Sequence, residues 1–80
     1  MTVQRIDIRK RQLKEGRVIF NGKSSVLSCV VRDVSEYGAR IKIGEPYRVP
    51  DIFELIIGGA APRPARKVWI GPGELGVAFT

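Results

Sequence analysis

Residues 32–40, which read RDVSEYGAR, decide how this chain is interpreted. An apolar-rich run, residues 26–31, precedes them, and a run that alternates apolar with basic or small residues, 39–44, follows. Asp and Ser side chains can bond nearby backbone amides, and Gly tolerates a positive φ angle. Residues 33–38 therefore predict a short corner between two β-strands.

The same corner brings three different chemical groups together at a strand edge. Asp33 supplies a hydrogen-bond acceptor, Ser35 a hydroxyl and Gly38 a bare stretch of backbone. This combination suits the binding of a polar ligand. From these residues alone, the other interpretation is that they only build a turn.

Length and composition limit the class of protein. The chain has 80 residues, 44% of them hydrophobic and 28% charged, which indicates one small globular domain. No apolar run approaches the ~20 residues of a membrane span, and the first residues are too charged for a signal peptide. One cysteine and no histidine exclude an internal disulfide and Cys/His metal sites. We expect a cytoplasmic protein without a metal or cofactor, in which Cys29 is a small core residue.

The positive charge is concentrated near the N-terminus. The net charge is +6, and residues 1–17 hold six Lys or Arg against two acidic residues. A basic excess at one terminus favours an anionic partner such as a nucleotide, a nucleic acid or lipid headgroups. The alternative is a solvated tail that only aids solubility.

The remaining pattern is that of an all-β protein. We expect strands at residues 17–20, 25–34, 39–43, 53–57, 65–70 and 75–79. The Asn21-Gly22 pair predicts a hairpin, and Pro62 and Pro64 place residues 60–64 in a loop. The strand at 25–34 is apolar on both sides, which predicts burial on both faces or a bulge. No segment of ten residues has helical spacing, so we predict a closed six-stranded antiparallel β-barrel over 16–80, preceded by a basic arm over 1–15.

With these features in place, the chain resembles a PilZ domain, a small bacterial β-barrel that in many members binds the second messenger cyclic di-GMP. That family has an Arg-x-x-x-Arg motif in the arm and an Asp/Asn-x-Ser-x-x-Gly motif between the second and third strands. Residues 33–38 fit the second motif, and Arg5 and Arg9 have the spacing of the first. The resemblance continues through residues 38–40, 50–55, 66–69 and 75–79.

The resemblance implies a cyclic di-GMP site formed by Arg5, Arg9, Asp33, Ser35 and Gly38. Secondary candidates are Arg11, Tyr37 and Arg40.

The side-chain chemistry suits this ligand. An arginine fork can meet a phosphate or a guanine edge and can stack on a base, and Asp33 can accept from guanine N–H groups. Arg40 and Arg66 alternate with core residues and are interpreted mainly as solvated surface charges, with Arg40 near enough to the corner to help hold a phosphate. Trp69 is interpreted as a core or rim aromatic residue rather than a base-stacking one.

Three functions remain for comparison. The first is a non-enzymatic receptor that changes the conformation of the arm when cyclic di-GMP binds. The second is a PilZ-like adaptor that binds no nucleotide and contacts a protein involved in motility, adhesion or envelope control. The third, a nucleic-acid-binding barrel, has only charge in its favour, since six of 80 residues are aromatic. An enzyme is not expected, because histidine is absent and the acidic residues suggest no acid–base pair.

Overall fold

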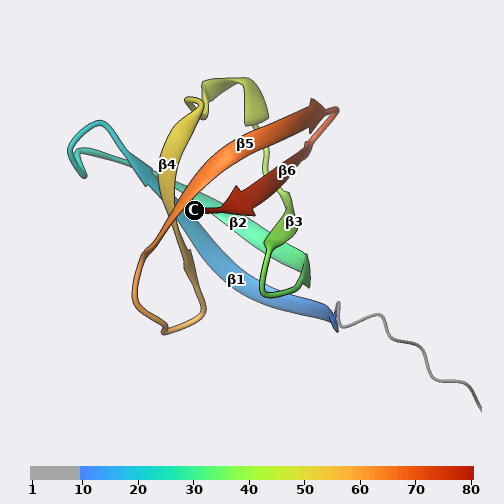
Figure 1. Ribbon diagram of the computed structural model, residues 1–80. Helices are drawn as coiled ribbons and strands as arrows, with labels where there is room; N and C mark the ends of the chain where they lie inside the picture. Colours follow the sequence, from blue (N-terminus) through green and yellow to red (C-terminus); the bar gives the residue numbers. More distant parts are fainter. Residues whose placement is uncertain (1–9) are drawn as a thin grey trace, which may run out of the picture.

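The computed structural model describes the backbone of residues 10–80 and the side chains of residues 13–80. It is a closed antiparallel barrel in the strand order β1-β2-β3-β6-β5-β4 (Figure 1). This confirms the expected six-stranded antiparallel fold. Its elements are β1 (Lys10–Phe20), β2 (Ser25–Val34), β3 (Gly38–Lys42), the 3₁₀ turn η1 (Pro46–Arg48), β4 (Ile52–Ile57), β5 (Arg63–Gly71) and β6 (Glu74–Phe79).

Two strands, β1 and β5, begin more than one residue earlier than the sequence pattern predicts. β1 begins at Lys10, so residues 10–15, expected to belong to the arm, are part of a strand that pairs with β2. Their lack of apolar alternation hid this strand, because its backbone pairing does not depend on an apolar face. β5 begins at Arg63 and includes Pro64, which was expected to lie in a loop. Pro64 is tolerated because it is the second residue of the strand, where few ladder bonds depend on its missing N–H.

The hairpin between β1 and β2 has a four-residue loop around the predicted Asn-Gly turn. Phe20 pairs with Ser25, and the Lys23 N–H donates to the Phe20 carbonyl over 3.1 Å. Positive φ angles occur at three consecutive residues, Asn21 (60°), Gly22 (64°) and Lys23 (72°). Asn and Gly adopt this region at low cost, which fixes the position of the turn.

The core takes one completely buried side chain from each strand. These residues are Val18, Val31, Ile41, Leu55, Ala65 and Leu75. Cys29 of β2 joins them with 7% of its surface exposed, and burial raises the pKa of its thiol to about 11. Such a thiol is protonated at neutral pH, which agrees with the expected role of Cys29 as a core residue.

The strand registers contain three irregularities. In β2, Val31 pairs with Ile41 but Asp33 pairs with Arg40, which leaves Arg32 as an extra residue. Of the two alternatives for β2, the bulge is present, and burial on both faces is not, because Val26 and Val30 remain 52% and 40% exposed.

The second bulge is in β5, and the third irregularity is in β1. Lys67 pairs with Val77 while Trp69 pairs with Gly76, so Val68 is the extra residue of β5. The register of β1 against β2 shifts between Arg11 and Lys14. Bulges redirect side chains and strengthen local twist, so these positions are where simple alternation fails.

Helical structure is minimal. Among residues 10–80 the only helical segment is the three-residue η1, and no helix there is long and apolar enough to cross a membrane.

Two substitutions in β4, one at a buried residue and one at an exposed residue, test which side chains form the core. Leu55→Ala removes a side chain with no exposed surface and should lower the free energy of unfolding by about 2–5 kcal/mol. The matched control is Ile52→Ala, at a residue that is 66% exposed, which should cost about 1 kcal/mol or less. Urea unfolding measures both, and equal losses would contradict the assignment of the core.

Candidate ligand-binding face

Four residues from four adjacent strands form one row across the barrel. Asp33 of β2 pairs with Arg40 of β3, Arg40 pairs with Gly76 of β6, and Gly76 pairs with Trp69 of β5. Directly paired residues place their side chains on the same face of a sheet. In β3, Arg40 alternates with the buried Ile41, so the row lies on the outer face of the barrel.

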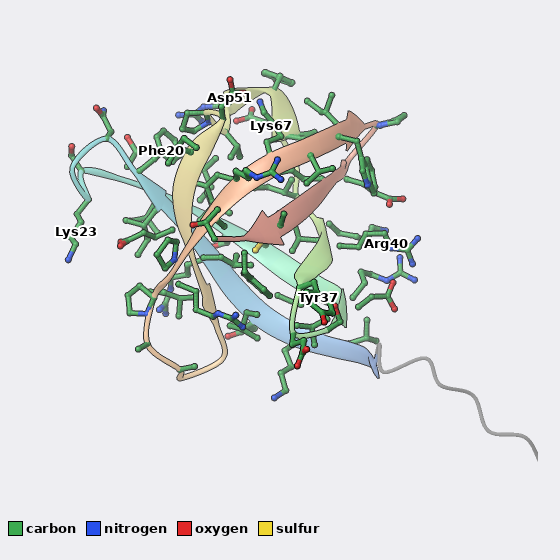
Figure 2. All side chains as sticks on the ribbon, in the orientation of Figure 1. Phe20, Lys23, Tyr37, Arg40, Asp51 and Lys67 are labelled. Atoms are coloured by element: carbon green, nitrogen blue, oxygen red, sulfur yellow. The ribbon has the colours of Figure 1, made fainter. Side chains whose placement is uncertain are left out.

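A cavity of about 380 Å³ lies over three residues of this row, Arg40, Gly76 and Trp69, while Asp33 does not line it. Its lining joins the predicted corner to the end of β5: Ser35, Tyr37, Gly38, Ala39, Arg40, Val68, Trp69, Gly76 and Val77. Figure 2 shows Tyr37 and Arg40 on the same side of the barrel, near β3. Four of the candidate residues, Ser35, Tyr37, Gly38 and Arg40, therefore line one cavity together with Trp69.

Asp33 and Arg40 form an ion pair beside this cavity. Arg40 Nη2 lies 2.8 Å from Asp33 Oδ2, and Arg40 Nε is 4.0 Å from Glu74 Oε1. Asp33 is only 5% exposed. A buried carboxylate requires a hydrogen-bonded cation to offset its loss of hydration, and Arg40 supplies one. Arg40 is thus a partner of the motif aspartate rather than only a solvated surface charge.

Ser35 builds the turn at the corner. Its hydroxyl oxygen accepts from the Tyr37 N–H over 3.2 Å, and its own N–H donates to the Gly38 carbonyl over 2.8 Å. The Tyr37 carbonyl accepts from the Phe79 N–H over 2.9 Å, which ties the corner to β6. The Tyr37 side chain remains 71% exposed at the edge of the cavity.

Gly38 is required by packing. A Cβ atom built on it would lie 2.2 Å from the carbonyl oxygen of Val77, so a side chain would push β3 away from β6. Among the described residues, positive φ angles occur at other positions and not at Gly38. The corner therefore needs this glycine for the close approach of β6, and not for an unusual backbone conformation.

Trp69 lies flat against Gly76. A Cβ atom on Gly76 would meet three atoms of the indole ring at 2.1–2.5 Å, so only glycine leaves room for the ring. Trp69 is nevertheless 45% exposed, and it lines the cavity together with Gly76. Sequence reasoning missed this role. The available signal was Gly76, a residue without a side chain between the apolar Leu75 and Val77 in the last strand.

The chain enters β1 beside the corner. Lys10 pairs with Val34, and Arg11 pairs with Asp33. Figure 1 shows this end of β1 on the side of the barrel where β2 meets β3. Arg5 and Arg9 lie outside the described residues, and the side chain of Arg11 is likewise not described.

A second cavity, of about 620 Å³, contains none of the motif residues. It is lined by residues 15–17 of β1, 28–30 of β2 and 42–44 at the end of β3, with Gly58 and Gly73. We place the candidate site at the smaller cavity because it is lined by the motif residues Ser35 and Gly38 and by the exposed aromatic side chains of Tyr37 and Trp69. Within residues 10–80 no cluster of three His, Cys, Asp or Glu side chains is placed to hold a metal ion.

Comparison with known proteins identifies the family to which this chain belongs. Residues 8–80 match the PilZ domain family, and the chain belongs to that family. This family is known for binding cyclic di-GMP, and its members are binding or adaptor domains rather than enzymes. The matched range includes Arg9 and the corner but begins after Arg5.

One solved structure with the same fold is the PilZ domain of CeSA from a cellulose-synthesizing bacterium. The two chains are 23% identical and superpose with a TM-score of 0.70, over 90% of this chain and 79% of the other. At this identity the likeness shows the fold. No curated protein sequence matches the chain.

Substituting two glycines tests why Gly38 is needed. Gly38→Ala should lower the free energy of unfolding by about 1–3 kcal/mol, because the new methyl group collides with the Val77 carbonyl. The control is Gly44→Ala, where nothing lies within 4 Å of the built Cβ and the cost should stay within about 0.5 kcal/mol. Chemical denaturation compares them, and an equally stable Gly38→Ala protein would refute the packing role.

Proposed function

We propose that this chain is a receptor domain for cyclic di-GMP, which binds over the outer face between Trp69 and the corner at residues 33–38. The observation that supports this most is the shared cavity: the serine and glycine of the family motif line it together with Arg40 and an exposed tryptophan face. The domain acts by binding and by a change in conformation, without chemistry on the ligand.

Each group around the cavity has a role that its chemistry supports. Trp69 offers a flat ring for stacking on a guanine, and its position is fixed by contact with Gly76. Arg40 offers guanidinium N–H groups to a phosphate or to guanine O6 and N7. Asp33 holds Arg40 in place through the 2.8 Å ion pair. The Ser35 hydroxyl accepts from Tyr37 and keeps its own proton for donation to the ligand.

The basic N-terminal residues complete the site in this proposal. Lys10 pairs with Val34 next to the corner, and Arg9 precedes Lys10 in the sequence. One residue spans at most about 3.8 Å of backbone, so the long side chain of Arg9 can reach a ligand at the corner. Arg5 is the second arginine of the spaced pair, and Arg11, the register partner of Asp33, is the alternative to it. A change in the conformation of this segment on ligand binding is what a partner protein, of the kind that controls motility, adhesion or the envelope, would detect.

A second candidate function is an adaptor that binds no nucleotide. It is favoured by the fact that the polar groups of the motif already have partners: Asp33 with Arg40, and Ser35 with Tyr37. In that case the corner only stabilises the fold, and the exposed side chains of Tyr37 and Trp69 contact a partner protein. A thermal unfolding scan distinguishes the two, because ligand at 100 times its dissociation constant adds about 2.7 kcal/mol of stability only to a receptor.

Removing the tryptophan tests the stacking surface. Trp69→Ala should weaken cyclic di-GMP binding by roughly 5- to 150-fold, since stacking on an aromatic side chain contributes about 1–3 kcal/mol per base. Tyr47→Ala is the matched control, because Tyr47 is an aromatic residue that is 70% exposed and does not line the cavity. Isothermal titration calorimetry measures both affinities, and unchanged binding by the Trp69 variant would remove this residue from the site.

Removing an arginine tests the contribution of the N-terminal segment. Arg9→Ala should weaken binding at least about tenfold, because a hydrogen bond to a charged group is worth about 1.5–3 kcal/mol. Arg9→Lys keeps the charge but loses the fork, so it should recover only part of that loss. Lys23→Ala, at the tip of the β1–β2 hairpin, is the control for a general loss of positive charge (Figure 2). Equal affinities for the parent and the Arg9→Ala protein, by the same titration, would count against the assigned arginine.

A further inference from the structure

The two outer edges of the β1–β2 hairpin are covered unequally. On the β1 side, residues 16–19 pair with β4, from Gly16 with Ile57 to Ile19 with Glu54. On the β2 side, pairing with β3 begins only at Val30. Residues 25–29 are paired with β1 alone, so among the described strands none covers their other edge. In Figure 1 this part of the hairpin projects from the barrel, with its tip away from β3, β5 and β6.

This open edge lacks the features that normally prevent strands from pairing between molecules. Natural edge strands carry lysines, prolines or bulges that block the approach of a second strand. Residues 24–31 contain no charged residue and no proline. The bulge of β2 is at Arg32, beyond the open part. Val26, with 52% of its surface exposed, adds apolar surface to the strand.

We propose that residues 25–29 are a homotypic interface, at which β2 of one copy pairs antiparallel with β2 of a second copy about a two-fold axis at Leu27. This register uses all five open residues of each copy. It sets Leu27 opposite its own equivalent, Val26 opposite Ser28, and Ser25 opposite Cys29. The result is a continuous sheet in the order β4-β1-β2-β2-β1-β4, which pairs the edge in both copies.

A second copy of this chain fits the edge because the residues that the two-fold register sets opposite each other are all uncharged. Beyond the paired residues, Lys23 falls opposite Val31 and Arg32 falls opposite Gly22, so no two like charges meet. A partner selected by charge would need an acidic or basic group in this segment, and residues 24–31 have none. The contact is short compared with the about 800 Å² per partner of a standard interface, so it should be weak and dependent on concentration. It lies at the hairpin end of β2 and the corner lies at the other end, so this proposal is independent of nucleotide binding.

Sedimentation equilibrium over a wide range of protein concentration tests the interface and its register. The parent chain should shift from monomer to dimer as its concentration rises. In the proposed register, positions 26 and 28 of the two copies face each other. The double substitution Val26→Lys with Ser28→Lys therefore opposes like charges and should give a monomer at every concentration. Val26→Lys with Ser28→Glu opposes unlike charges and should dimerise at least as well as the parent.

Both variants alter exposed side chains, so circular dichroism should show the same fold for each. Hydrogen exchange of the parent provides a measurement that needs no variant: amides in residues 25–29 should gain protection at high concentration, while those of β6 should not. A parent chain that stays monomeric, a lysine pair that still dimerises, or a lysine–glutamate pair that does not, would each overturn the proposal.

Discussion

One extra residue in β2 determines how the candidate site is arranged. Because Arg32 is bulged, Asp33 is paired with Arg40. A regular register continued from Val31 and Ile41 would pair Arg32 with Arg40 and would set two like charges directly opposite each other. The bulge replaces that repulsion with a 2.8 Å ion pair to a carboxylate that is nearly inaccessible to water.

A second extra residue, Val68 in β5, determines which residue of β6 lies opposite Trp69 on the other side of the cavity. A regular register continued from Lys67 would pair Trp69 with Leu75, which is completely buried. With the bulge, Trp69 is paired with Gly76, the one neighbour in β6 that leaves space for the indole ring. The site thus depends on two bulges. The bulge in β2 sets Asp33 opposite Arg40, and the bulge in β5 sets Trp69 opposite Gly76.

The sequence predicted the parts of the structure that depend on local pattern. The Asn21-Gly22 turn, the six strands and the closed barrel follow from alternation and turn chemistry, and β2 has the predicted bounds. It also placed Ser35 and Gly38 at one corner. The pairing of Asp33 with Arg40 and the position of Trp69 were not predictable in this way, because each depends on a bulge whose position alternation does not specify. The early start of β1 was missed because residues 10–15 have no apolar face to reveal a strand.

The surfaces proposed for ligand and for self-association occupy opposite ends of β2, and the second of them exists because β3 pairs with β2 only from Val30 onward. The central claim is that cyclic di-GMP binds over the row from Asp33 to Trp69. Titration of the nucleotide into isotopically labelled protein, followed by amide and indole N–H chemical shifts, tests it most directly. The account predicts the largest changes at residues 33–40, at Gly76 and at the indole N–H of Trp69. Changes centred on Gly16, Cys29 and Gly44 around the larger cavity, or no changes at all, would contradict it.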